Sequence, residues 1–252
     1  MPFLTAGGHR LEYERIDGAR DRPTLILLHE GLGSIALWRD FPAKLAQATG
    51  CPAVVYSRYG YGRSDPLAGP RHVDYMHREA LDTLPELRTK LGLDDAILVG
   101  HSDGASIALI HAGSGRWPAR ALALEAPHVF VEEVSIASIA AARTAYETTD
   151  LRQRLARYHA DADSAFRGWN DIWLHADFRT WNIEDCLPGV RCPVLAIQGA
   201  DDEYGTLAQL DAIERGVAGP FDRLVLPQCK HSPHRDQEQA TAAEMMRFIA
   251  QV

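Results

Sequence analysis

The sequence predicts an α/β protein built around a mainly parallel β-sheet. Short apolar runs alternate with longer segments of helical spacing, which is typical of strands joined by covering helices. Most of the apolar runs are continuous, as in strands that are buried on both faces. The chain has 252 residues, of which 46% are hydrophobic. That is enough for one domain with a sizeable core and argues against disorder.

Eight segments are expected to be strands. The first two, Phe3–Thr5 and Arg10–Arg15, flank the turn Gly7-Gly8 and are expected to pair as an antiparallel edge. The others are Thr24–Leu28, Ala53–Tyr56, Ala96–Val99, Ala121–Leu124, Val194–Gln198 and Arg223–Leu226.

Segments of helical spacing between these runs are expected to cover the sheet. They are Trp38–Ala48, Tyr75–Leu91, Gly104–Ala112, Leu207–Val217 and Glu238–Ile249. Gly92 follows the longest of them and is a typical helix-stop signal.

One region interrupts the alternation, because residues 130–187 contain no strand pattern. Three helical stretches stand there: Val134–Tyr146, Leu151–His159 and Ser164–Trp173. We expect a single domain with its core at residues 1–129 and 188–252 and a helical lid at residues 130–187. The alternative interpretation is an extended helical layer.

Charge and hydropathy indicate which kinds of binding partner to expect. The 26 basic and 34 acidic side chains give a net charge of −8, so we expect no nucleic-acid partner and no attraction to an anionic membrane. No apolar run is long enough to cross a bilayer, and the N-terminus lacks a signal-peptide pattern. We therefore expect a cytoplasmic protein that acts on a small molecule.

The cysteines and histidines do not predict a metal centre. The four cysteines are scattered and are expected to be free thiols. Cys229, His231 and His234 lie close together in the sequence, but a fourth ligand and a second cluster are missing. We expect no metal and no cofactor.

The strongest chemical signal is Gly100-His101-Ser102-Asp103-Gly104, where an apolar strand gives way to a helical pattern. This is G-x-S-x-G in the strand–turn–helix context of a nucleophile elbow. A tight turn there would lift the Ser102 side chain above the sheet edge, and glycines would avoid clashes across the turn. The helix that follows would point its N-terminus at developing negative charge. The alternative is a surface serine in a tight turn.

A serine nucleophile needs a base, and the base needs an orienting carboxylate. His231 and His234 follow the last strand, and Asp201 and Asp202 follow the strand before it. The order Ser, Asp, His is the one found with nucleophile elbows. All these residues follow strands at their carboxyl ends, where doubly wound sheets place their sites.

These motifs resemble the α/β-hydrolase superfamily, in its small esterase and C–C hydrolase branch, over nearly the whole chain. His29–Ser34 (HEGLGS) resembles the family's oxyanion loop, and Ser57–Ser64 (SRYGYGRS) resembles its Arg/Gly-rich loop. Glu30 departs from the family, which most often has glycine there. The resemblance implies an α/β-hydrolase fold, with a mostly parallel eight-stranded sheet flanked by helices and a helical lid.

The resemblance also implies which residues form the site. The family's acid stands three residues after the glycine that ends its strand, which implies Asp202. Its histidine precedes a short turn with Ser and Pro, which implies His231. The oxyanion hole would use the backbone N–H groups of Gly31 and Asp103. The N–H of Leu32 is the alternative to that of Gly31.

Other side chains are weaker candidates. His128 follows a strand end, and Trp169 and Trp173 lie in the expected lid, so we predict that these three contact the substrate; Trp181 is a further candidate. The alternative interpretations are a histidine satisfied by hydrogen bonds and aromatics of the ordinary core. The Asp103 carboxylate would either tune substrate charge or favour the helix N-terminus.

Ser102 argues against the branch of the family that uses an aspartate nucleophile, and so against dehalogenase and epoxide-hydrolase chemistry. We expect hydrolysis of a carboxylic ester through an acyl-enzyme. The alternatives are a C–C bond hydrolase of ring-cleavage products and a thioesterase. Ring-cleavage products are often anionic, and no arginine is assigned to bind them. A non-catalytic binding module would commonly have lost a member of the triad, and all three are present.

Overall fold

A computed structural model describes residues 1–252, and its eight strands form one sheet. The strands are β1 (Phe3–Ala6), β2 (His9–Ile16), β3 (Thr24–Leu28), β4 (Ala53–Tyr56), β5 (Ala96–His101), β6 (Ala121–Glu125), β7 (Val194–Gly199) and β8 (Phe221–Leu226). Their order is β1-β2-β4-β3-β5-β6-β7-β8. Only the β1–β2 and β2–β4 pairs are antiparallel. The mostly parallel, eight-stranded sheet is thus confirmed.

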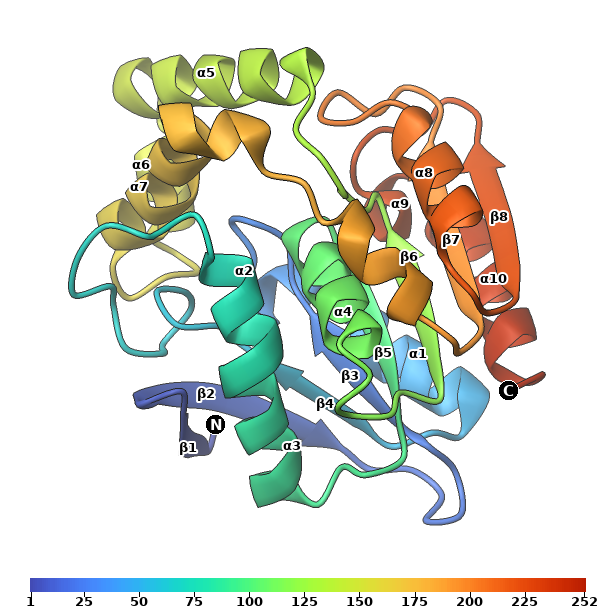
Figure 1. The fold of residues 1–252 in the computed structure, drawn as a ribbon. Coiled ribbons are helices and arrows are strands. Elements are labelled where there is room, and N and C mark those ends of the chain that lie inside the picture. The colour runs from blue at the N-terminus through green and yellow to red at the C-terminus, as the bar shows by residue number, and fades with distance from the viewer.

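Helices cover both faces of the sheet (Figure 1). Side chains alternate between the faces, so Leu25 and Leu27 pack in a core with α1 (Phe41–Thr49) and α10 (Glu238–Ile249). Ile26 and Leu28 pack in the larger core on the other face. The helices on that face include α2 (Tyr75–Arg78), α3 (Leu84–Leu91), α4 (Asp103–Gly113) and α8 (Ala208–Gly216).

Two expected helices differ from their predicted form. The first does not run from Trp38. A 3₁₀ helix η1 (Ile35–Trp38) ends at Trp38, the next residue Arg39 has a φ of 55° that breaks the helix, and α1 begins at Phe41. The second runs from α2 to α3 through a π-helical segment, η2 (Glu79–Thr83). Pro85, the second residue of α3, comes just after this wider turn and has no N–H to donate to a preceding carbonyl.

Residues 130–187 contribute no strand to the sheet. They form α5 (Glu133–Thr148), α6 (Leu151–Leu155), α7 (Ala162–Trp173) and two 3₁₀ helices, η3 (Ala176–Thr180) and η4 (Glu184–Gly189). Figure 1 shows α5, α6 and α7 grouped beyond the carboxyl ends of the strands. The last piece, η4, packs instead against α4 and α8 of the core.

Loops of the core hold this helical group in place. His159 accepts a hydrogen bond from the Gly62 N–H (3.0 Å) and donates through Nε2 to the Leu32 carbonyl (3.0 Å). The Ala160 N–H donates to the Gly62 carbonyl at 2.7 Å. These contacts explain why α6 ends at Leu155, four residues before the predicted end at His159. None of the helices in the structure has the length and apolar character to cross a bilayer.

Candidate active site

Ser102 stands in the turn between β5 and α4. Its backbone has φ 54° and ψ −118°, a sparsely populated conformation for a non-glycine residue. A β-carbon on Gly104 would lie 2.0 Å from the Leu28 carbonyl oxygen, and one on Gly100 would lie 2.6 Å from the Ala105 Cα. Both positions therefore require glycine for space, and the turn has the geometry of a nucleophile elbow.

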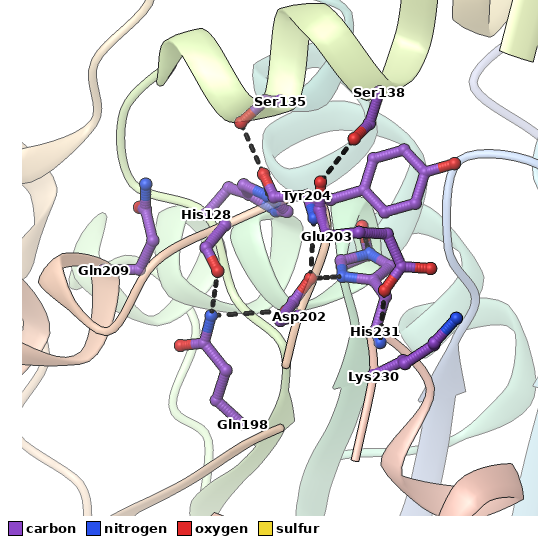
Figure 2. Close-up of polar contacts among 12 residues, drawn as sticks. His128, Ser135, Ser138, Gln198, Asp202, Glu203, Tyr204, Gln209, Lys230 and His231 are labelled. Carbon is purple, nitrogen blue, oxygen red and sulfur yellow. Dashed lines mark hydrogen bonds and ion pairs between the residues drawn. The ribbon is translucent and has the colours of Figure 1, made fainter. Parts of the chain in front are cut away.

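The structure brings Ser102, His231 and Asp202 into one hydrogen-bonded row. His231 Nε2 lies 2.9 Å from Ser102 Oγ, and His231 Nδ1 lies 2.8 Å from Asp202 Oδ1. Figure 2 shows Asp202 directed at the His231 ring, whereas Asp201 is exposed to solvent. Because a carboxylate can only accept, Nδ1 carries the proton and Nε2 is free to accept one from the serine.

The Asp202 carboxylate is buried and well satisfied. Oδ1 also accepts the Tyr204 N–H (2.8 Å), and Oδ2 accepts the Gln198 side-chain amide (3.2 Å). Burial alone would raise the pKa of Asp202, but the hydrogen bond and charge of His231, with the Tyr204 N–H, hold this pKa below its ordinary value. Asp202 is thus ionised at neutral pH.

Helix α5 supports the loop that carries the acid. The hydroxyls of Ser135 and Ser138 donate to the backbone carbonyls of Tyr204 and Glu203 (Figure 2). These two serines were not among the residues predicted from the sequence. The available signal was their spacing of three, which places both on one face of a helix.

The neighbouring His234 and Cys229 have other partners. Nδ1 and the backbone N–H of His234 both lie within hydrogen-bonding distance of Glu125 Oε2, at 3.0 and 2.8 Å. Cys229 is buried in the core beneath α10. With His231 bound to Asp202, the three side chains do not converge on one point.

The candidate oxyanion donors flank Ser102. Gly31 and Leu32 line the same cavity as Ser102, and neither backbone N–H donates to a protein acceptor. Asp103 is the first residue of α4, where N–H groups have no acceptor within the helix. The backbone N–H groups of Gly31 and Leu32 are therefore both free to donate to an oxyanion together with that of Asp103.

A small cavity opens above Ser102, with a volume of about 110 Å³. Its lining residues are Glu30, Gly31, Leu32, Ser102, His128, Ser135, Ile139, Trp169, Trp173, Tyr204 and His231. Lysine and arginine are absent from this wall. His128, Trp169 and Trp173, which we predict to contact substrate, all line it, whereas Trp181 is buried outside it.

His128 offers the cavity wall a hydrogen-bond acceptor. Its Nε2 donates to the Tyr204 carbonyl at 3.1 Å, so Nε2 carries the ring proton. Burial is the main cause that lowers the pKa of His128, and a positive charge on the nearby His231 would lower it further. The His128 ring is therefore neutral. Its buried Nδ1 has no partner within the protein.

Comparison with known proteins decides the family. A family model described as "Alpha/beta hydrolase family" matches residues 25–244. The chain belongs to the α/β-hydrolase family.

Relatives of this α/β hydrolase carry several activities. A proline iminopeptidase of Lactobacillus delbrueckii subsp. lactis is 33% identical over 112 residues, which is 44% of this chain and only 37% of that protein. The enol-lactonase of Burkholderia xenovorans LB400 superposes with a TM-score of 0.77 at 20% identity, over 99% of this chain and 100% of the other. A carboxylesterase structure from Nitrososphaera gargenis gives a TM-score of 0.79 at 20% identity, over 99% and 98%. These structural likenesses show the shared fold.

Glu30 distinguishes this α/β hydrolase from the glycine usual at its position. Its carboxylate lies 3.5 Å from His101 Nδ1 and 3.5 Å from Arg235 Nη2. Burial alone would raise the pKa of Glu30, but the nearby His101 and Arg235 hold this pKa well below its ordinary value. His101 Nε2 in turn donates to the His231 carbonyl (2.7 Å). Glu30 thus connects the oxyanion loop with the backbone of His231.

Proposed function

We propose that this chain is a serine hydrolase that cleaves carboxylic esters through an acyl-enzyme. The observation that carries the proposal is the continuous row of hydrogen bonds from Ser102 through His231 to Asp202. This row starts at the elbow, where Ser102 has a sparsely populated backbone conformation, and it borders the cavity of about 110 Å³. Geometry and roles of this kind are what identify a catalytic triad, whatever the sequence positions.

The reaction would follow from the hydrogen-bond directions. His231 Nε2 takes the proton of Ser102 as Oγ attacks the ester carbonyl carbon. The carbonyl oxygen becomes an oxyanion that accepts from the N–H groups of Gly31 and Asp103. The C–O bond then breaks, and the alcohol leaves with the proton from His231. Water attacks the acyl-enzyme with His231 as base, and the acid departs as Ser102 recovers its proton.

The cavity wall favours a small, neutral acyl group. Trp169, Trp173 and Ile139 supply apolar surface, and no cationic side chain stands among the lining residues. A ring-cleavage product with a carboxylate would find no counter-ion there, which favours esters over the C–C bond alternative. A thioester of the same acyl group would pass through the same acyl-enzyme.

We also propose that α5–α7 form a lid over the site. Three observations support it: the helices lie beyond the carboxyl edge of the sheet (Figure 1), they supply both tryptophans of the cavity, and α5 supports the acid loop. Covering the site would exclude water and strengthen the electrostatics around the oxyanion.

The test is hydrolysis of p-nitrophenyl esters from acetate to decanoate by wild type and Ser102→Ala. We expect the highest kcat/KM for short acyl chains and a loss of several orders of magnitude in the variant. Ser114→Ala, at the other end of α4, is the matched control and should keep wild-type activity. If Ser102→Ala keeps more than about a tenth of the activity, the serine mechanism is wrong.

A further inference from the structure

Arg58 is a buried cation that takes no part in the proton transfers above. It follows β4 in the Arg/Gly-rich loop, and its side chain is only 1% exposed. A buried charge is costly unless it is paired and hydrogen-bonded. Its partners therefore indicate why the chain keeps it there.

The guanidinium binds the peptide that leads into the oxyanion loop. Arg58 Nη2 donates to the Glu30 carbonyl at 2.9 Å and to the His29 carbonyl at 3.3 Å. The Arg58 backbone N–H donates to His29 Nε2 (3.0 Å), and His29 Nδ1 donates to the same Glu30 carbonyl (2.7 Å). Two donors thus converge on one oxygen.

That oxygen belongs to the same peptide unit as the Gly31 N–H. A trans peptide is planar, so the N–H points opposite to the C=O. Groups that fix the Glu30 carbonyl therefore also fix the direction of the Gly31 N–H. A cation on the carbonyl polarises the peptide as well, which makes its N–H a stronger donor.

The residue that carries the other candidate N–H donor also contacts Arg58. Asp103 carries the second N–H; its carboxylate is not among the groups that line the cavity, and Oδ2 lies 3.6 Å from Arg58 Nη2. Oδ2 also accepts the Tyr75 hydroxyl at 2.7 Å. Tyr75 in turn accepts the Trp173 indole N–H at 3.1 Å, so a residue of α7 reaches this cluster too.

We infer that Arg58 is a positioning residue for the oxyanion hole, held by Asp103 and orienting the Glu30–Gly31 peptide. The inference rests on the proposed serine mechanism. Because the oxyanion exists only in the transition state and the tetrahedral intermediate, the contribution of Arg58 falls on kcat and leaves KM nearly unchanged.

The experiment compares Arg58→Met, Arg58→Lys and Asp103→Asn with wild type. Arg58→Met should lower kcat by about a hundredfold, as loss of one oxyanion donor does, with KM within a few-fold of wild type. Affinity for a trifluoromethyl ketone, which forms a tetrahedral adduct, should fall by the same factor, and affinity for the matching methyl ketone should not. Arg58→Lys should recover part of the loss, since an ammonium still reaches the Glu30 carbonyl. Asp103→Asn should show the same pattern as Arg58→Met to a smaller degree.

Arg71→Met is the matched control. Both arginines stack over the Tyr61 ring, with the guanidinium carbon 5.0 Å from the ring centroid for Arg71 and 4.9 Å for Arg58. Arg71, however, donates to the Tyr59 carbonyl and not to the oxyanion loop. It should keep both kcat and the preference for the trifluoromethyl ketone.

Active sites are counted by titration with a fluorophosphonate, so that kcat refers to folded enzyme. If kcat per titrated site and the ketone preference stay at wild-type values while the melting temperature falls, Arg58 is structural and the inference is wrong. Should Arg58→Met not fold, the same comparison on Arg58→Lys and Asp103→Asn decides. Ser102→Ala tests the underlying mechanism separately.

Discussion

The indole of Trp169 lies directly against the Cα of Gly31. A β-carbon added to Gly31 would lie 2.2 Å from Trp169 Cδ1. The backbone of Gly31 is not in the left-handed region, so glycine is needed here for space alone. Since Trp169 comes from α7 and Gly31 from the oxyanion loop, the helical segment helps to shape the candidate site.

Gly31→Ala should therefore damage catalysis through its clash with Trp169. We expect kcat/KM to fall about tenfold or more in the wild-type background and much less in the Trp169→Ala background, which is the coupling expected of residues in contact. A double-mutant cycle on ester hydrolysis measures it. Equal losses in both backgrounds would mean that the contact does not limit activity.

Trp173→Ala should change acyl-chain preference, because Trp173 lines the cavity above Ser102. We expect kcat/KM for bulky esters to change much more than for acetyl esters. Trp181→Ala is the control, since Trp181 packs in the same core but outside the cavity. If Trp173→Ala instead loses kcat/KM equally for both kinds of ester, melts at a lower temperature and behaves like Trp181→Ala, then Trp173 serves only in core packing.

Asp202→Asn should reduce kcat by about three to four orders of magnitude, because an amide would favour the wrong tautomer of His231. Asp201→Asn should stay near wild type, since Asp201 is exposed and its side chain makes no contact with His231. Steady-state kinetics on both variants decide between the two aspartates. A greater loss in Asp201→Asn would move the acid to that residue.

The lowered pKa of Asp202 predicts a pH-dependent contribution to folding stability. Because the pKa is lower in the folded chain, the contribution is present above the ordinary aspartate pKa of about 4 and is lost as pH falls through the folded value. Urea unfolding should show wild type losing more stability from pH 6 to pH 3 than Asp202→Asn. Parallel loss in both proteins would show that Asp202 contributes no such term.

The sequence predicted the sheet well because its central strands are buried on both faces. Continuous runs such as Ile97–Val99 have few other plausible roles, and G-x-S-x-G fixes its own turn through glycines that cannot be replaced. The predicted end of α6 was wrong because hydrogen bonds from His159 and Ala160 to distant loops decide where this helix ends.

The Arg58–Asp103 pair was beyond sequence reasoning for the same reason. Asp103 has the local signal of a carboxylate at a helix N-terminus, and that interpretation fits its position. Its buried partners, Arg58 and Tyr75, come from other segments and become neighbours only in the folded chain. No spacing pattern connects the three residues.

The most direct test of Ser102 as the nucleophile is to find where a covalent adduct forms. Wild type and Ser102→Ala are incubated with a fluorophosphonate, digested and examined by peptide mass spectrometry. If Ser102 is the nucleophile, wild type should carry one phosphonyl group per chain, on the peptide that contains Ser102. Ester hydrolysis should be lost in proportion to labelling, and the variant should carry no adduct. An adduct on another residue, or full labelling that leaves hydrolysis unchanged, would contradict the assignment of Ser102 as the nucleophile.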